Sequence, residues 1–342
     1  MRKVKWGVLG AAKIAIQKVI PAMQDGTRSE IVALASRDPA RARSAADSLG
    51  IARAYGSYEE LLRDPEIEAV YNPLPNHLHV PWSIKAAQAG KHVLCEKPIA
   101  LSVKEARELI QARERTGRKI QEAFMVRSHP QWLATLELIQ SGRIGSLQSI
   151  QGFFSYNNPD PANIRNIAEY GGGALMDIGC YPITISRMVF GQEPHRVSAT
   201  MELDRDLKVD RLTTAILEFP AGQSAFTCAT QLVPYQRMHV FGSSGRIEVQ
   251  IPFNAPPDRP CRIFVDGGEL FGTQIESRDF DVCNQYTIQG DLFSQAIQEG
   301  GPVAVPLEDS LRNMAVIEAI VRSAGSGRWE KPVTADPPDA PA

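Results

Sequence analysis

The chain has 342 residues, which is long for one hydrophobic core and predicts two domains at a typical size of about 150 residues. Its formal net charge of -2 gives no basic surface, so we expect no nucleic-acid partner and take small molecules as the default ligands. No segment approaches the roughly 18 consecutive apolar residues of a membrane span. Five scattered cysteines without a C-x-x-C pair indicate a reducing compartment, so we expect a cytoplasmic protein away from membranes.

The first 125 residues alternate short apolar runs with helical patterns, which indicates an α/β fold with a doubly wound parallel sheet. Strands are expected where Val, Ile and Leu gather, at residues 3–9, 31–36, 69–73, 92–96 and 119–124. Two helices carry a capping box, at Ser57 to Glu60 and at Ser102 to Glu105. Gly90 and Gly117 are expected to end helices in a left-handed conformation. We predict a Rossmann domain over residues 1–125.

From residue 126 the pattern changes to longer alternating segments, which are typical of a mostly antiparallel sheet. The expected strands are 149–156, 196–203, 213–219, 224–231 and 237–241. Helices are expected at 131–140, 181–189, 291–299 and 307–323. We therefore predict a C-terminal α+β domain with a large open sheet over residues 126–331, followed by a proline-rich disordered tail at 332–342.

The first predicted strand runs directly into Gly10, Ala11, Ala12, Lys13 and Ile14, and a helical pattern follows. Against the dinucleotide-binding pattern G-x-G-x-x-G/A, Gly10 keeps the first glycine, Ala12 replaces the second and Ala15 takes the third position. The amino end of the helix would offer N–H groups to a pyrophosphate. An ordinary strand-to-helix turn remains the alternative.

The second predicted strand ends in Ser36 and Arg37. NAD-specific proteins place an acidic residue here to bind the ribose 2′-hydroxyl. A hydroxyl and a guanidinium would instead bind a 2′-phosphate, so the sequence predicts NADP(H). The alternative is that Arg37 only faces solvent.

Two further motifs stand at the ends of the next strands. At the end of the predicted strand 69–73, we expect contacts to the cofactor from Pro73, Leu74, Asn76 and His77. At the end of the predicted strand 92–96, we expect contacts to the cofactor from Glu96 and Lys97, although a structural ion pair between these two is the alternative. His77 and His79 form an H-x-H pair without an acidic or cysteine partner at ligand spacing, so no metal site is predicted. Arg127 and His129 are expected either to line the same cleft or to anchor the domain linker.

A glycine-rich segment, Gly171-Gly-Gly-Ala-Leu-Met-Asp177-Ile-Gly-Cys-Tyr181, leads into a predicted helix. Asp177 and Tyr181 stand four residues apart, so on a helix they would share one face and reach the same substrate. The alternative is that Asp177 caps the helix while Tyr181 packs in the core.

Together, the Gly10 turn, the Glu96-Lys-Pro98 motif and the Gly171–Tyr181 block resemble the glucose-fructose oxidoreductase/inositol dehydrogenase/MocA (Gfo/Idh/MocA) family over nearly the whole chain. The resemblance implies an N-terminal Rossmann domain and a C-terminal domain whose open sheet often forms a dimer interface. It therefore implies a homodimer or a homotetramer assembled through that sheet.

The resemblance also assigns roles to individual residues. Lys97 takes the position of the catalytic lysine, Asp177 the acidic position and Tyr181 the proton-transfer position. Many relatives have His where this chain has Tyr181. With tyrosine at this position, the chain resembles the branch that contains glucose-fructose oxidoreductase, NADP-linked aldose (xylose) dehydrogenases and dimeric dihydrodiol dehydrogenase. Residues 158–165 also resemble the xylose dehydrogenase members. Contacts to a sugar-like substrate are expected from Asp177, Arg165 and Arg127.

The implied reaction moves hydride between NADP(H) and a sugar-like alcohol or carbonyl held between the domains. A free phenol has a pKa of about 10, so Tyr181 would need the Lys97 ammonium to favour its anionic form. Since only two residues precede the first strand and no N-terminal arm covers the cofactor, we expect NADP(H) to exchange each cycle. Oxidation of trans-dihydrodiols and a non-catalytic NADP(H) sensor are the two alternatives.

Overall fold

The computed structural model describes residues 2–268 and 271–334, and these residues divide into two compact units. The first unit takes the described residues up to Ser128 together with Asn284–Ser310, and the second takes His129–Cys283 and the described residues from Leu311 on. The sequence predicted that residues 126–331 form the second domain. In the structure, Asn284–Ser310 belong instead to the first unit, which the sequence did not predict. Residues 335–342 of the expected tail lie outside the described residues.

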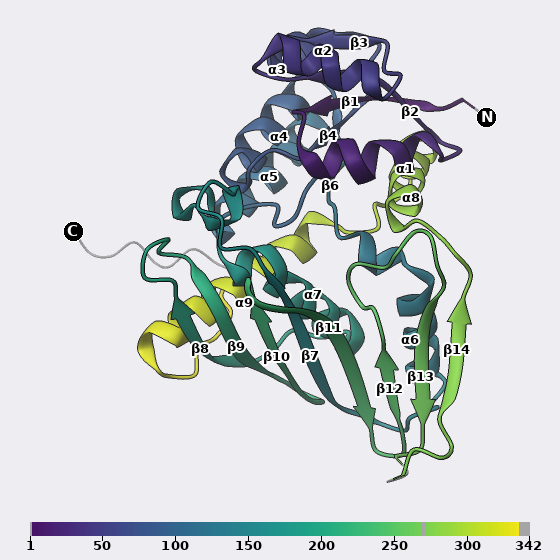
Figure 1. Ribbon diagram of the computed structural model, residues 1–342, viewed down its shortest axis with the longest axis vertical. Helices are drawn as coiled ribbons and strands as arrows, with labels where there is room; N and C mark the ends of the chain where they lie inside the picture. The colour runs from purple at the N-terminus through teal and green to yellow at the C-terminus, as the bar shows by residue number, and fades with distance from the viewer. Residues whose placement is uncertain (1, 269–270, 335–342) are drawn as a thin grey trace. The chain divides into compact units, whose positions relative to one another are not determined.

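The first unit is built on a six-stranded parallel sheet (Figure 1). Its order is β3-β2-β1-β4-β5-β6, and its strands are β1 Val4–Leu9, β2 Ser29–Ala35, β3 Arg53–Tyr55, β4 Ala69–Asn72, β5 His92–Cys95 and β6 Ile120–Glu122. The chain leaves β1 first to one side and then to the other, so the strand order reverses at β1. In open α/β sheets ligands bind at the carboxyl ends of the strands beside such a reversal. This doubly wound sheet confirms the predicted fold class.

Helical segments connect these strands: η1 Ala15–Val19, α1 Ile20–Gln24, α2 Pro39–Ser48, α3 Tyr58–Arg63, η2 Asn76–Leu78, α4 His79–Gln88, α5 Val103–Thr116 and η3 Met125–Ser128. The predicted helix starts are confirmed, because Ser57 Oγ accepts from the Glu60 amide at 3.2 Å and Ser102 Oγ accepts from the Glu105 amide at 3.1 Å. The Glu60 carboxylate does not close an ideal capping box, since it accepts instead from the Gly56 amide at 3.1 Å.

Helix α8, Gln285–Glu299, explains why a late segment of the chain belongs to the first unit. The Phe293 ring packs 5.6 Å from the Trp6 ring, and the Trp6 indole donates to Ser294 Oγ at 3.1 Å. In Figure 1 this helix lies beside α1. The sequence predicted a helix at residues 291–299, but the apolar face of a helix does not show which of the two sheets the helix covers.

The second unit is built on an eight-stranded sheet of order β14-β13-β12-β11-β7-β10-β9-β8. The strands are β7 Leu147–Asn157, β8 Arg196–Leu203, β9 Asp210–Phe219, β10 Gly222–Ala229, β11 Gln231–Gly242, β12 Arg246–Val249, β13 Cys261–Asp266 and β14 Glu276–Phe280. Among the described residues of this sheet, only β7 and β10 pair in parallel, so the predicted mostly antiparallel sheet is confirmed. The last three strands were not predicted.

The other elements of the second unit are α6 Pro130–Gln140, η4 Ile164–Asn166, η5 Ala168–Tyr170, η6 Leu175–Gly179 and α7 Cys180–Phe190. Helix α9, Leu307–Ser326, begins with the last residues of the first unit and continues in the second. The sheet packs against α7 through the Phe190 and Phe219 rings, which stack 4.3 Å apart. Within the described ranges, no helix is long and apolar enough to cross a membrane.

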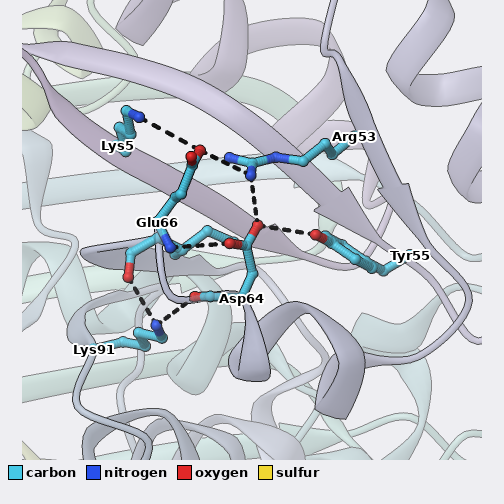
Figure 2. A network of polar contacts seen from close by, with 7 residues as sticks. Lys5, Arg53, Tyr55, Asp64, Glu66 and Lys91 are labelled. Atoms are coloured by element: carbon cyan, nitrogen blue, oxygen red, sulfur yellow. Dashed lines mark hydrogen bonds and ion pairs between the residues drawn. The ribbon is translucent and has the colours of Figure 1, made fainter.

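A polar network in the first unit fastens the edge strand β3 to the loop before β4 (Figure 2). Asp64 lies at its centre, and its carboxylate accepts from the Tyr55 hydroxyl at 2.9 Å, the Arg53 guanidinium at 3.0 Å and the Glu66 amide at 2.9 Å. The buried Lys91 ammonium donates to the Asp64 carbonyl at 2.7 Å. Burial alone would raise the pKa of Asp64, but these donors outweigh it and lower the pKa.

We predict that Asp64→Asn lowers the free energy of unfolding by about 1–3 kcal/mol at pH 7, because it removes charge-assisted hydrogen bonds from a buried group. A lowered pKa in the folded state stabilises the fold above the unfolded-state pKa near 3.9, and this contribution is lost as the pH falls through the folded-state value. Urea denaturation should therefore show the difference between the two proteins shrinking below about pH 4. The exposed Glu66→Gln is the control, and an equal loss in it would contradict the prediction.

Candidate active site

The turn after β1 has the geometry that a dinucleotide-binding turn requires. Gly10 has a φ of +100°, and a Cβ on it would lie 3.0 Å from the Leu74 side chain, so only glycine is accommodated without strain. Ala11 and Ala15 are buried, whereas the Lys13 side chain is exposed. The helical backbone begins at Lys13, close behind the turn, so its first N–H groups are available to an anion.

The end of β2 carries two guanidinium groups. Arg37 is exposed and bonds the hydroxyl of buried Tyr58, whose pKa is raised by burial and lowered in part by Arg37 and Arg41. Arg41 Nη2 donates to the Ala11 carbonyl at 2.9 Å, which ties α2 to the dinucleotide turn. Sequence reasoning missed Arg41, although its place one helical turn after Arg37 is a signal that was available.

The hydroxyl and carboxylate side chains just past β2 make local contacts. The buried Ser36 hydroxyl accepts from the Asp38 amide at 3.3 Å. The Asp38 carboxylate caps α2, accepting from the Ala40 and Arg41 amides at 2.9 and 3.1 Å. Because this carboxylate is engaged as a helix cap, the guanidinium groups are the charged groups offered to a ligand at this tip.

The loop after β4 brings the next predicted cofactor residues to the same edge of the sheet. Pro73 and Leu74 are buried, and Asn76 and His77 are partly exposed. Burial lowers the pKa of His77, and the positive charge of Arg37 lowers it further, so the ring and the guanidinium are neighbours. The structure thus brings residues of the β2 and β4 ends together.

Glu96 and Lys97 follow β5, and both are partly exposed. The Tyr71 hydroxyl donates to one oxygen of the Glu96 carboxylate at 2.7 Å, and the Lys97 amide donates to the other at 3.3 Å. Tyr286 at the start of α8 also lies near this pair, since burial and Glu96 raise its pKa while the positive charge of Lys97 lowers it. Sequence reasoning identified neither tyrosine as part of the Lys97 environment.

The glycine-rich block of the second unit permits a close approach of two backbone segments. A Cβ on Gly172 would lie 2.4 Å from the Arg165 carbonyl oxygen, and one on Gly173 would lie 2.0 Å from Oδ1 of Asp210. The Gly173 amide donates to the Arg165 carbonyl at 2.8 Å. These glycines therefore bring Arg165 to the start of the helix that carries Asp177.

Asp177 lies at the centre of a polar cluster in the second unit. Its carboxylate accepts from the Tyr156 hydroxyl at 2.6 Å and from Arg165 Nε at 3.1 Å. Its side chain is 12% exposed, whereas that of Arg165 is 42% exposed. Asp177 is thus held by two donors rather than serving only as a helix cap. Tyr156, at the end of β7, was missed because strand alternation alone does not mark it.

Tyr181 lies in the first turn of α7, four residues after Asp177 on a continuous helical segment. Its ring packs 5.8 Å from Phe154 and 5.6 Å from Phe253, and the residue is 4% exposed. These aromatic contacts restrict the orientation of the phenol.

Arg127 has a partner inside the first unit. It forms an ion pair with Asp309, and both side chains are largely buried. In the second unit, His129 caps α6 by accepting from the Gln131 amide at 3.2 Å. Both contacts support the anchoring alternative for these two residues.

The comparisons with known proteins cover both halves of the chain. Residues 4–124 match the family described as "Oxidoreductase family, NAD-binding Rossmann fold", and residues 132–248 match the GFO/IDH/MocA C-terminal domain. The uncharacterized oxidoreductase ORF334 of Rhizobium meliloti is 52% identical, with coverage of 96% of this chain and 99% of that protein. D-xylose 1-dehydrogenase (NADP(+)) 2 of Haloferax volcanii is 38% identical, with coverage of 94% and 98%.

A solved structure of KijD10, a 3-ketoreductase from Actinomadura kijaniata in complex with NADP and TDP-benzene, has a TM-score of 0.88. It is 29% identical to this chain, and the match covers 94% of this chain and 98% of the other. These findings confirm the resemblance inferred from the sequence. The chain belongs to the Gfo/Idh/MocA family of oxidoreductases, whose Rossmann domain binds NAD(P).

Proposed function

We propose that this protein is an NADP(H)-dependent oxidoreductase that moves hydride to or from a sugar-like alcohol or carbonyl group. The observation that carries the proposal is the Asp177 carboxylate, held between the Tyr156 phenol and the Arg165 guanidinium one helical turn before Tyr181. Such a cluster offers both donors and acceptors to a substrate rich in hydroxyl groups. A non-catalytic sensor of NADP(H) would not need this cluster.

The preference for NADP(H) over NAD(H) rests on the β2 tip. Arg37 and Arg41 supply two guanidinium groups for a phosphate, and Ser36 adds a hydroxyl. The Gly10 turn and the helix that follows it would hold the pyrophosphate. The names of the Haloferax relative and of the Actinomadura structure both specify NADP.

When bound, NADP(H) supplies or accepts the hydride. In the proposed mechanism Tyr181 moves the proton between its phenol and the reacting oxygen of the substrate. Lys97 stands at the family's catalytic lysine position, and we assign its positive charge to stabilising negative charge that develops in the reaction. Asp177 orients a neighbouring substrate hydroxyl, and Arg165, the more exposed member of the cluster, binds another.

We predict that Arg37→Ala raises the Kd for NADPH by about 10–100-fold, since a hydrogen bond between charged groups contributes about 1.5–3 kcal/mol. The Kd for NADH should change by less than about threefold, because NADH has no 2′-phosphate to lose the contact. Fluorescence titration measures both constants. Arg43→Ala, a change on the following helix α2 at a residue that pairs with Asp47, is the control. Equal losses of both coenzymes would refute the preference for NADP(H).

We predict that Lys97→Met and Tyr181→Phe each lower kcat by at least about 100-fold, the usual scale of general acid–base catalysis. NADPH should still bind to both, with a Kd within about tenfold of the wild-type value, because at most one cofactor contact is removed. NADPH absorbance followed against aldoses, keto sugars and trans-dihydrodiols provides the assay and selects among substrate classes. Lys85→Met and Tyr55→Phe are the matched controls. Full activity in both catalytic variants would rule out the assignment.

We also propose that two copies of the chain associate through the face of the eight-stranded sheet opposite α7. Phe219 of β9 faces α7, so the alternate residues Thr214, Ile216 and Glu218 face the other way. Ile216 is 38% exposed there. An open sheet face that carries exposed apolar side chains suits a second copy.

Sedimentation analysis is expected to show a dimer or tetramer for the wild-type protein and a smaller species for Ile216→Glu, since a buried unpaired charge would oppose association. Leu133→Glu is the control, because this side chain is 48% exposed on α6 rather than on the sheet. A monomeric wild-type protein would contradict this mode of assembly.

A further inference from the structure

The peptide between Pro98 and Ile99, next to Lys97, is held at both of its polar atoms by buried side chains. The Pro98 carbonyl oxygen lies 2.7 Å from Nδ1 of His79. The Ile99 amide donates to Oε1 of Glu122 at 2.9 Å. His79 and Glu122 are each 1% exposed. The proposed mechanism assigns no role to either residue.

The second ring nitrogen of His79 reaches another part of the candidate site. Nε2 lies 2.6 Å from the Leu74 carbonyl oxygen, and the Leu74 side chain is the one that a Cβ on Gly10 would meet. One imidazole therefore joins the loop over the dinucleotide turn to the segment that carries Lys97.

The charge state of His79 follows from burial in a site with two acceptors. Burial lowers the pKa of His79 to about 4, the Pro98 and Leu74 carbonyls raise it, and the positive charges of Lys97 and His77 lower it further. A neutral ring donates to one of the two carbonyl oxygens, and a protonated ring donates to both. The contacts of His79 with the Pro98 and Leu74 carbonyl oxygens can therefore be tested one at a time, with a substituted side chain whose single amide group reaches only one of them.

Glu122, at the end of β6, titrates near neutral pH. Burial raises the pKa of Glu122 to about 7, and the Ser310 hydroxyl and the Ile99 amide oppose the rise. Asp309 adds to the rise and Arg127 reduces it, but Arg127 is paired with Asp309. Whether ionised or neutral, the carboxyl group keeps an oxygen that accepts from the Ile99 amide.

We propose that His79 and Glu122 are positioning residues that fix the Pro98–Ile99 peptide and so hold the backbone from which Lys97 projects. His79 also couples this segment to the loop that packs on the dinucleotide turn. The inference deepens the proposed function and rests on it, because the placement of Lys97 matters through its part in hydride transfer. It predicts that different substitutions of His79 will change kcat and the Kd for NADPH independently of each other.

Two variants of His79 separate its two contacts. Asparagine places its amide nitrogen near the position of Nδ1, and glutamine places its own near Nε2. His79→Asn should keep the Pro98 contact and kcat but raise the Kd for NADPH by about tenfold, the cost of one hydrogen bond. His79→Gln should keep the Leu74 contact and the Kd but lower kcat by about tenfold, and His79→Leu should lose both. Asparagine and glutamine variants with identical kcat and Kd would overturn the proposal.

Glu122 is tested by removing either its charge or its hydrogen bond. Glu122→Gln keeps an acceptor for the Ile99 amide, whereas Glu122→Met removes it. Glu122→Met should lower kcat by about tenfold more than Glu122→Gln does, without a change in the Kd for NADPH. Equal kcat values for Glu122→Met and the wild type would overturn the proposal.

Asp64→Asn is the matched control for loss of stability. Asp64 is also a buried carboxylate that accepts a backbone amide, but it lies before β4, at the amino ends of the strands. Its substitution should lower stability while leaving kcat and the Kd for NADPH unchanged. If it lowered kcat as much as Glu122→Met does, the effect of Glu122 would be general destabilisation and the proposal would fail.

A readout that needs no turnover separates this inference from the proposed function. After reductive ¹³C-methylation, the resonance of Lys97 is identified by its absence in Lys97→Arg. It should shift in His79→Gln and Glu122→Met but stay in place in Asp64→Asn. A wild-type protein inactive on every substrate would refute the proposed function alone, whereas a Lys97 resonance unmoved in both variants would refute the positioning role of His79 and Glu122 alone.

Discussion

The candidate cofactor site depends on one constraint, the reversal of strand order at β1 in a sheet whose strands all run the same way. Because all strands of this sheet run in the same direction, the residues just past their carboxyl ends lie along one edge of the sheet. Gly10, Arg37, Leu74 and Lys97 each follow a different strand, and the topology places all four at the same edge of the sheet. The side chains then need only local contacts, such as that of Arg41 with the Ala11 carbonyl, to be held in place.

The second unit organises its polar site by a different means, the close approach of backbone to backbone. Gly172 and Gly173 leave no room for a Cβ, and this allows the loop that carries Arg165 to lie against the start of the helix that carries Asp177. The guanidinium and the Tyr156 phenol then meet the carboxylate from different elements. Gly172 and Gly173 therefore contribute to the site mainly by allowing the two backbone segments to lie close together, and less by making the chain flexible.

Periodicity and local start signals predicted most of the fold, and they failed where local sequence does not carry the deciding interaction. The hydroxyl caps of Ser57 and Ser102 are local, and the structure has them as predicted. The three-residue strand β3 is too short to show alternation, and Asp64 on a neighbouring loop fastens it. Strands β12, β13 and β14 form the end of the larger sheet, where pairing with the preceding strand defines each one.

The candidate site residues divide in the same way. Motif positions such as Gly10, Lys97 and Asp177 were found because spacing along the chain marks them. Tyr156 and Tyr286 were missed because each acts across elements that are distant in sequence, whereas Arg41 was missed although its spacing from Arg37 marks it. His79 was noticed only as half of a possible metal pair, and its contacts with two backbone carbonyls depend on two loops folding around it.

Two buried carboxyl groups of the first unit show how the supply of donors decides the charge of a buried acid. Asp64 has a phenol, a guanidinium and an amide directed at its oxygens, and its pKa is lowered despite burial. Glu122 has one amide and a hydroxyl, while the nearby Arg127 is paired with Asp309, and its pKa rises to about 7. The carboxyl at the amino ends of the strands is therefore charged at neutral pH, whereas the pKa of the one that accepts from the Ile99 amide lies near neutral pH. Burial is the main cause of this rise, and Arg127, which is paired with Asp309, offsets only part of it.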